Sequence, residues 1–416
     1  MNKGVLVILI ISMLLLSELI NLTAFANSSA SSTVAEQENQ SVSNIGYVKY
    51  TLDLANNTLL NGNVNITNDI RPCEILYDPS NGDIYVTISN LNSVIVINGE
   101  TNTIVGNITV GPHPQSMAYD PQNGYIYVAD LFSNTLTVIN SKTNTVIGNI
   151  TVGQCPSAVL YDPSNGYIYV SHFLFNFVTV INGETNTVVG NITVGQCPET
   201  LLYDPQNGYI YVCTSYHIAV INGETNAVIR DIFVNRALFG MVYDPQNGYI
   251  YASLLPNSII VINPETNTIV GNITTKWALS CMLYDPENGY IYASLLQNSI
   301  IVINPETNTI VGNITVGSCP TGKAYDPENG YIYVANLKSG TISIISTSGT
   351  PPTSTSTTSP PITTPTTAPS TTSSQKSATS SSITTTPISI SSIEVYATIG
   401  VIVVIIAIAV ILLRKR

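Results

Sequence analysis

The chain has 416 residues, of which only 9% are charged, and its formal net charge at pH 7 is −12. Since globular proteins carry about 25% charged residues, the surface must be built largely from Asn, Thr, Ser, Gln and Tyr. A net negative charge repels nucleic acid, which is therefore not an expected partner.

The N-terminal part predicts export followed by a flexible leader. Lys3 precedes an apolar stretch at residues 5–16, and Ala-Phe-Ala at residues 24–26 forms a small-x-small cleavage site. This is the pattern of a signal peptide covering residues 1–26, with an uncleaved membrane anchor as the alternative. Residues 27–45 are rich in Ser, Ala, Gln and Asn, and we expect them to form the leader.

A repeat fills most of the remaining chain. A Tyr-Asp-Pro sequence recurs seven times at a spacing of 40 to 42 residues, and a fixed period of this length indicates a repeat architecture. The copies begin at Tyr77, Tyr119, Tyr161, Tyr203, Tyr243, Tyr284 and Tyr325.

Each copy contains four short apolar or alternating runs separated by turn residues, the pattern of consecutive antiparallel strands. In the second copy these strands, called a to d, are expected at about 116–119, 125–129, 135–140 and 145–151. Four strands without a helical pattern predict a β-propeller blade, and a solenoid is disfavoured because its rungs would be shorter. The Asp-Pro aspartates recur identically in a tight turn, so we interpret them as structural and not catalytic.

The last blade needs a strand from elsewhere, because the seventh copy supplies three strands and ends at Ser346. Residues 47–54 and 58–67 also have strand patterns, and the second ends in Asn-Val-Asn-Ile-Thr, in register with the d strands. We expect an N-terminal strand to complete this blade, which leaves no exposed sheet edges at the seam. The predicted fold class is therefore all-β, a seven-bladed propeller of four-stranded antiparallel blades over residues 46–347.

Several motifs recur within the repeats. They are Tyr-Ile-Tyr-Val in strand b, Val-Ile-Asn at the end of strand c, and a Thr-Asn-Thr-Val/Ile-Val/Ile-Gly-Asn-Ile run followed by Val-Gly-x-x-Pro. In these motifs the chain resembles the YVTN family of β-propellers, common in archaeal surface-layer proteins, over about residues 46–347. It departs from the family at the end of strand c, where Asn98, Asn140 and Asn182 replace the usual Asp.

The C-terminal part predicts a membrane tether. Residues 348–392 are almost wholly Thr, Ser and Pro, a composition typical of a disordered, O-glycosylated stalk. Residues 395–413 form an uncharged apolar run long enough to span a bilayer as one transmembrane helix. The positive charges of residues 414–416 would stay in the cytoplasm. We therefore expect a single-pass membrane protein at the cell surface, with the propeller outside.

Glycosylation sequons recur at one place in strand d. Asn and Thr two residues apart share one face of a strand, and strand d is the outermost strand with a free edge. Sugars there would block edge-to-edge pairing, so we expect N-glycosylation. The alternative is that Asn-Ile-Thr is simply the strand sequence of the family, and one repeat has Asp-Ile-Phe at residues 231–233 instead. The sequons are at Asn65, Asn107, Asn149, Asn191, Asn272 and Asn313.

Six cysteines in an exported chain favour disulfides. Cys155 and Cys197 lie in the d–a segments of adjacent blades, and Cys73 and Cys319 are neighbours across the seam, so we predict these two pairs. A metal site of Cys155, Cys197 and His113 is the alternative, but the chain has no CxxC motif and no metal is predicted.

The copies differ mainly in the d–a segments and the b–c loops, whereas the a–b and c–d turns barely vary. Both variable segments lie on one face of a propeller, around the channel entrance, and function on a rigid scaffold normally occupies such loops. Drift on an unconstrained face is the alternative. We call this surface the variable face, and its candidate ligand-binding residues are Arg71, Glu74, His113, His172, Phe173, Glu199, His217, Lys276, Trp277 and Lys323.

The tyrosine of each Tyr-Asp-Pro sequence is called the blade tyrosine. The residues three positions before the seven blade tyrosines, called the second row, are expected to form the channel wall. Its members are mostly small, with Glu74 as the exception. They are Glu74, Ser116, Ala158, Thr200, Gly240, Cys281 and Gly322.

Three functions fit these features. The leading hypothesis is a non-enzymatic binding, adhesion or surface-layer protein whose variable face meets envelope proteins or glycans. The alternative is an extracellular enzyme, since related-looking propellers include lactonase-like and lyase proteins with sites at the channel mouth; Glu74, His113, Glu199 and Lys323 would be the candidates. A third is a structural spacer without a ligand. The chain has no Gly-x-Ser-x-Gly, Walker or HExxH motif, so neither a catalytic residue nor a cofactor is predicted.

Overall fold

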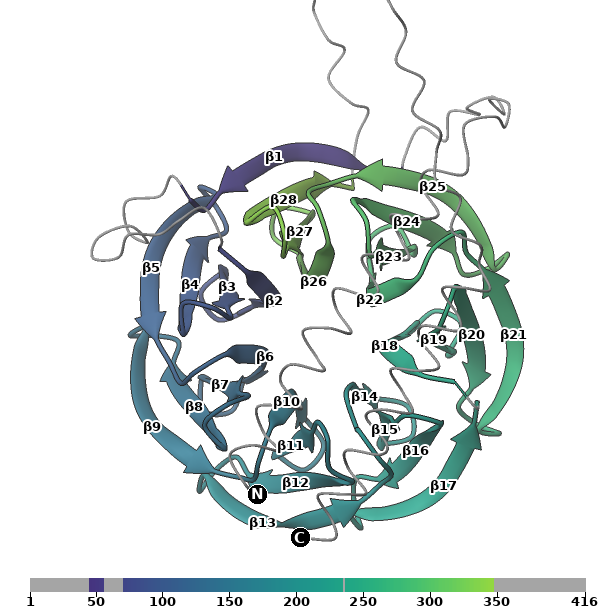
Figure 1. The fold of residues 1–416 in the computed structure, drawn as a ribbon, viewed down its shortest axis with the longest axis horizontal. Helices are drawn as coiled ribbons and strands as arrows, with labels where there is room; N and C mark the ends of the chain where they lie inside the picture. The colour runs from purple at the N-terminus through teal and green to yellow at the C-terminus, as the bar shows by residue number, and fades with distance from the viewer. Residues whose placement is uncertain (1–44, 56–69, 235, 348–416) are drawn as a thin grey trace, which may run out of the picture. The chain divides into compact units, whose positions relative to one another are not determined.

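The computed structural model describes residues 45–55, 70–234 and 236–347. These residues form 28 strands, which make seven four-stranded sheets arranged as blades around a central axis (Figure 1). Neighbouring strands of a blade pair antiparallel. The predicted all-β, seven-bladed propeller of four-stranded blades is therefore confirmed.

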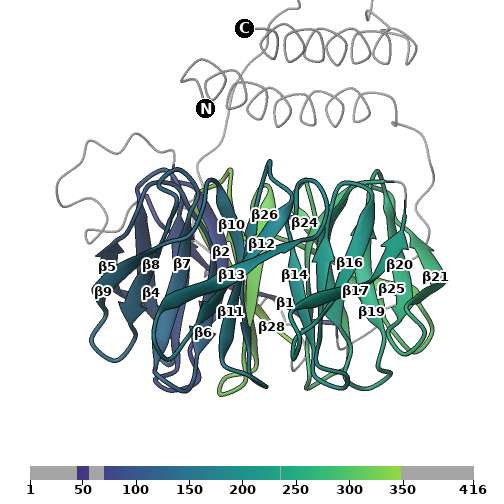
Figure 2. The same ribbon diagram turned by 90° about the horizontal axis from the view of Figure 1, so that it is seen from below.

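The second blade shows how one repeat becomes a sheet. From the axis outward its strands are β6 (Pro114–Asp120), β7 (Tyr125–Asp130), β8 (Thr135–Asn140) and β9 (Thr145–Thr151) (Figures 1 and 2). Strands c and d have the predicted bounds, and strand b is one residue longer. Strand a begins two residues earlier than predicted because Pro114 pairs with Asp130 across a bulge.

The other blades follow the same order, with strand a at the axis and strand d outermost. Blade 1 contains β2 (Pro72–Tyr77), β3 (Asp83–Ile88), β4 (Ser93–Asn98) and β5 (Thr103–Thr109), and blade 3 contains β10 (Pro156–Asp162), β11 (Tyr167–His172), β12 (Phe177–Asn182) and β13 (Thr187–Thr193). Blade 4 contains β14 (Leu201–Asp204), β15 (Tyr209–Cys213), β16 (His217–Asn222) and β17 (Ala227–Phe233). Blade 5 contains β18 (Leu238–Tyr243), β19 (Ile250–Leu254), β20 (Ser258–Asn263) and β21 (Thr268–Thr274), and blade 6 contains β22 (Leu279–Tyr284), β23 (Ile291–Leu295), β24 (Ser299–Asn304) and β25 (Thr309–Thr315).

Blade 7 is completed by a strand from the N-terminal part, as predicted. Its own strands are β26 (Pro320–Asp326), β27 (Tyr331–Asn336) and β28 (Thr341–Ser346), and β1 (Tyr47–Asp53) pairs antiparallel with β28 on the outside of the ring (Figure 1). The outermost place in this blade thus belongs to residues 47–53, although it is the sequon at Asn65 that is in register with the d strands. Asn65 itself lies outside the described residues.

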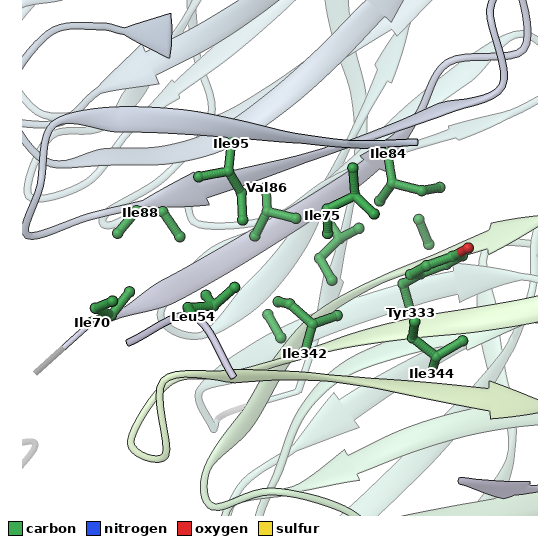
Figure 3. Close-up of a cluster of buried hydrophobic side chains, with 13 residues drawn as sticks. Leu54, Ile70, Ile75, Ile84, Val86, Ile88, Ile95, Tyr333, Ile342 and Ile344 are labelled. Atoms are coloured by element: carbon green, nitrogen blue, oxygen red, sulfur yellow. The ribbon is translucent and has the colours of Figure 1, made fainter. Parts of the chain in front are cut away.

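The seam between blades 7 and 1 is sealed by apolar side chains. Leu54 and Ile70 are almost completely buried and belong to one cluster with Ile88 of blade 1 and Ile342 and Tyr333 of blade 7 (Figure 3). The Leu54 N–H also donates to the Gly340 carbonyl at 3.2 Å. Burial of branched apolar side chains on both sides of the seam supplies the driving force for closing the ring.

One tyrosine in each blade bonds to the next blade. This tyrosine stands at the third position of the strand b motif, and it is fully buried in all seven blades. The Tyr127 hydroxyl donates to Asn186 Oδ1 at 2.8 Å, and across the seam the Tyr333 hydroxyl donates to Asn102 Oδ1 at 2.6 Å. Asn102 has a φ of 55°, a left-handed conformation that asparagine adopts more readily than most residues. This explains why the c–d turns repeat an asparagine at this point.

We expect Tyr333→Phe and Tyr127→Phe each to lower the free energy of unfolding by about 1 to 3 kcal/mol, because each leaves a part-buried asparagine carbonyl without its hydroxyl donor. Denaturant unfolding of the two variants measures this. Equal losses would show that the seam bond is equivalent to a bond inside the ring, and no loss at Tyr333 would contradict its role in closure.

The expected stalk at 348–392, the spanning segment at 395–413 and the signal peptide at 1–26 lie outside the described residues. Within the part of the chain that the structure describes, no helix has the length and apolar character needed to cross a membrane.

Candidate functional site

The two variable segments of each blade meet at one end of the propeller. In blade 2 the Leu131 N–H donates to the His113 carbonyl at 3.2 Å, and in blade 3 the Phe173 N–H donates to the Cys155 carbonyl at 3.0 Å. The corresponding bond in blade 7 joins Leu337 to Cys319 at 3.0 Å. Each b–c loop is therefore fixed to its own d–a segment, so the two variable segments of a blade lie at the same end of the propeller.

A pocket of about 530 Å³ opens among these segments and takes lining residues from all seven blades. The whole predicted second row lines it, from Glu74 in blade 1 to Gly322 in blade 7. Of the ten predicted ligand-binding residues, four line it as well: Glu74, Phe173, Glu199 and Lys323. A pocket of this size accommodates a small organic ligand or one residue of a larger one.

Glu74 and Lys323 form a charged corner where blades 6, 7 and 1 meet. The Lys323 ammonium is buried and donates to the Cys281 carbonyl at 2.9 Å, the Ser294 hydroxyl at 2.6 Å and the Thr321 carbonyl at 3.3 Å. Burial lowers the pKa of Lys323, while Cys281 and Glu74 act in the opposite direction. Burial raises the pKa of Glu74 to about 7, although the Ile75 N–H and the charge of Lys323 oppose the rise.

Glu199 lies in the wall of the same pocket, just before the short strand β14. Its backbone is held by Cys213, whose carbonyl accepts the Glu199 N–H at 3.0 Å. Among the described residues, its carboxylate has no hydrogen-bond partner, and burial raises its pKa to about 7. The pocket therefore contains two carboxyl groups that change charge near neutral pH.

Phe239 also lines the pocket, and the sequence did not single it out. It belongs to β18 and is 37% exposed. A signal was present in the repeat alignment, because Phe239 stands four residues before Tyr243, as Glu199 stands four residues before Tyr203. Six of the seven residues at this position line the pocket, and Ser280 of blade 6 is the exception.

The three predicted histidines do not line the pocket. His172 is fully buried, with Nδ1 2.9 Å from the Gln154 carbonyl and Nε2 2.8 Å from the Thr179 hydroxyl, and burial lowers its pKa. His113 packs against Phe132 with the two rings tilted and a centroid distance of 4.6 Å. His217 Nε2 lies 2.9 Å from the Val194 carbonyl. These contacts give the histidines structural roles within the variable face.

Three further candidates also lie away from the pocket wall. The Lys276 ammonium lies 5.6 Å from the centre of the Trp277 ring, and Trp277 packs against the core cluster of blades 5 and 6. Arg71 is exposed, and its carbonyl accepts the Ser89 N–H at 3.0 Å. The predicted ligand-binding set thus divides into four pocket residues and six residues of the surrounding rim.

The structure contains all six cysteines as free thiols, so neither predicted disulfide is formed in it. Cys155 and Cys197 are bonded to opposite ends of one loop, through the Phe173 N–H at 3.0 Å and the Phe175 carbonyl at 2.8 Å. The Cys73 thiol donates to the Arg71 carbonyl at 3.7 Å. Within the described ranges, no three His, Cys, Asp or Glu side chains gather as metal ligands.

The five sequons that the structure describes all lie on outer strands. Their asparagine and threonine side chains are exposed, as expected for strand d. The Asn149 and Asn191 side-chain carbonyls accept hydrogen bonds from Thr137 at 3.1 Å and Thr179 at 2.8 Å. This contact directs the amide nitrogen, the atom to which a sugar would be joined, away from the sheet. The described sequons are Asn107, Asn149, Asn191, Asn272 and Asn313.

No protein-family model and no curated protein matches the chain, so the resemblance to the YVTN family stays a prediction. Among solved structures, the chain is similar to one described as Kuenenia stuttgartiensis hydrazine synthase, with a TM-score of 0.63 and 16% sequence identity. The match covers 68% of this chain and 98% of that chain. At this identity the likeness shows a shared fold alone.

Proposed function

We propose that the chain is a non-enzymatic binding protein of the cell surface, and that the pocket of the variable face is its recognition site. The observation that carries this proposal is the contrast between the two faces. Seven repeats that are otherwise nearly alike differ where they line the pocket, while the opposite turns repeat and bond neighbouring blades together. A rigid ring whose repeats vary mainly around one opening is suited to presenting a binding site.

The predicted signal peptide, the stalk and the C-terminal spanning segment support display outside the cell, with envelope proteins or glycans as the partners. This arrangement fits an adhesion or surface-layer protein. The propeller would stand away from the membrane on residues 348–392 and turn its variable face to a neighbour.

Binding of the purified full chain to envelopes isolated from its own host tests this function. The informative variant is Phe132→Ala with Phe173→Ala, which removes two aromatic rings from the b–c loops of the variable face. We expect it to lose at least about tenfold in affinity, because aromatic anchors dominate most interfaces. Glu224→Ala with Glu265→Ala, in exposed turns of the opposite face, is the matched control. Equal loss in both, or loss in neither, would contradict recognition by the variable face.

An extracellular enzyme is the second candidate, because Glu74, Glu199 and Lys323 share one pocket and both carboxyl groups have a pKa of about 7. Such a carboxyl group suits general acid or base catalysis at neutral pH. His113, the fourth candidate, is outside the pocket wall. Turnover of lactone or ester substrates that disappears in Glu199→Gln or Glu74→Gln would favour this function. An inert pocket across such a screen would exclude it for those substrates.

We also propose that the outer strands carry N-linked sugars. Exposed apolar residues such as Val105 and Val189 stand two residues before the sequon asparagines, so sugars would cover an apolar belt as well as a free sheet edge. We expect Asn149→Gln to remove the mass of one glycan from the mature protein in intact-mass spectrometry. The control Asn140→Gln, which alters no sequon, should keep it. The same mass change in both variants, or in neither, would contradict glycosylation at Asn149.

A further inference from the structure

The pocket has one negative charge without a counter-charge. The charged residues that line it are Glu74, Glu199 and Lys323. Lys323 makes three donor contacts, as an ammonium does, and its charge opposes the rise in the pKa of Glu74. Glu199 has no such partner, since burial is the whole cause of its pKa shift. A carboxylate that is partly withdrawn from water without a cation is costly, and a positively charged ligand would relieve that cost.

The segment that carries Glu199 is fixed to the blades on both sides. The Ser171 hydroxyl of blade 3 donates to the Glu199 carbonyl at 3.4 Å. Toward blade 5, the Thr200 hydroxyl donates to the Phe239 carbonyl at 2.9 Å. These contacts fix the main chain at Glu199 and Thr200 between blades 3 and 5, which bear Phe173 and Phe239.

The neighbouring aromatic rings add a second preference for cations. Phe173 from blade 3 and Phe239 from blade 5 both line the pocket, one on each side of the blade that carries Glu199. Phenyl faces attract ammonium groups and also receive apolar ligand bodies. A pocket wall that contains both a carboxylate and aromatic side chains therefore favours a ligand that has both a positive head and an apolar part.

We propose that the pocket takes an organic monocation, with an ammonium head beside the Glu199 carboxylate and an apolar body against Phe173 and Phe239. This inference rests on the proposed function, since it assigns a ligand class to the same pocket. A primary amine of this kind could be a free metabolite or a lysine or amino-sugar group of an envelope partner. A small free amine therefore probes the shared chemistry.

Calorimetric titration of the full chain at pH 8 with benzylamine, and with neutral benzyl alcohol as the matched probe, tests the proposal. We expect benzylamine to bind at least about ten times more tightly than the alcohol. Glu199→Gln should abolish this preference, and Phe239→Ala should weaken both probes. Glu224→Gln, an exposed residue of the same blade on the opposite face, should change nothing.

The preference for benzylamine over benzyl alcohol should also disappear at pH 5.5. Glu199 is protonated there, because the pKa of its carboxyl group is about 7. The other groups near it behave differently. Glu74 titrates in the same range beside Lys323, and the buried Cys213 thiol, which feels the charge of Glu199, stays neutral because its pKa is raised. A pH response that survives in Glu199→Gln would assign it to Glu74 and overturn the role of Glu199.

The outcomes separate this inference from the proposed function. Equal affinity for the two probes, or a cation preference that Glu199→Gln retains, would overturn the monocation site. If envelope binding is still lost in the Phe132→Ala, Phe173→Ala variant, the variable face remains the recognition site, but for another class of ligand. Benzylamine binding through Glu199 without any effect of that variant on envelopes would support the amine site and overturn recognition of the envelope by this face.

Discussion

Replacing Leu54 by alanine is expected to lower the free energy of unfolding by about 2 to 5 kcal/mol, the usual cost of deleting a fully buried leucine side chain. Leu54 is completely buried in the cluster that seals the seam, together with Ile70 and Ile342 (Figure 3). It follows directly after β1, the strand that covers the outer edge of β28. A cavity at this point weakens the packing of the N-terminal segment at the seam between blades 7 and 1, which is the contact that closes the ring. Denaturant unfolding followed by circular dichroism measures the loss.

The matched control is Tyr50→Ala in β1, where the side chain is 48% exposed. Its effect should stay below about 1 kcal/mol, because exposed substitutions seldom cost more. If the two variants lost the same stability, the seam cluster would contribute no more than the surface of β1. A large loss for Leu54→Ala alone would show that ring closure depends on this cluster.

The repeat predicts the fold well because the strands of blades 1 to 6 follow one another directly in the sequence. Alternating apolar residues set the strands, and the Asp-Pro turn at Asp120 and the asparagine at Asn144 set their ends. The repeat alone does not predict which strand pairs with the outer edge of β28, because that strand comes from a segment far away in the sequence. Residues 58–67 carry the motif of an outer strand, yet residues 47–53, which lack it, take the place. A local motif cannot settle a contact between the two ends of the domain.

The pocket could be predicted row by row, but not side chain by side chain. The spacing before each blade tyrosine correctly placed Glu74 and Gly322 in the channel wall. It could not show that His172 turns toward Thr179 inside its own blade while the next residue, Phe173, lines the pocket. The direction of a loop side chain depends on packing between blades, and a single repeat does not record that packing.

The buried carboxyl groups give the protein an unusual response to acid. Burial raises the pKa of Glu74 and of Glu199 from 4.5 to about 7, and that of Asp130 from 3.8 to about 6. A carboxyl group whose pKa is raised by folding binds its proton more tightly in the folded state than in the unfolded state. Its protonation therefore stabilises the fold as the pH falls through the folded pKa, and this gain is complete below the unfolded pKa. Most acid-sensitive proteins behave in the opposite way, because their native carboxylates are paired.

Histidines oppose this gain over part of the range. Burial lowers the pKa values of His113 and His172 from 6.5, so the unfolded chain takes up protons there more readily and the fold loses stability below that pH. Glu74, Glu199 and Asp130 act in the stabilising direction, and the two glutamates act from pH 7 downward. The carboxyl contribution is therefore expected to dominate between pH 7.5 and about pH 5.

We expect the free energy of unfolding to rise by about 1 to 3 kcal/mol when the pH falls from 7.5 to about 5, a reduced figure because the pocket admits water. The double variant Glu74→Gln, Glu199→Gln should lose most of this rise, since neither amide titrates. The double variant Glu224→Gln, Glu265→Gln removes the same charge from exposed turns of the opposite face and should keep it. Denaturant unfolding at four or five pH values distinguishes the two. An equal flattening in both variants would assign the effect to the overall charge of −12, and would overturn the role of the pocket carboxyl groups.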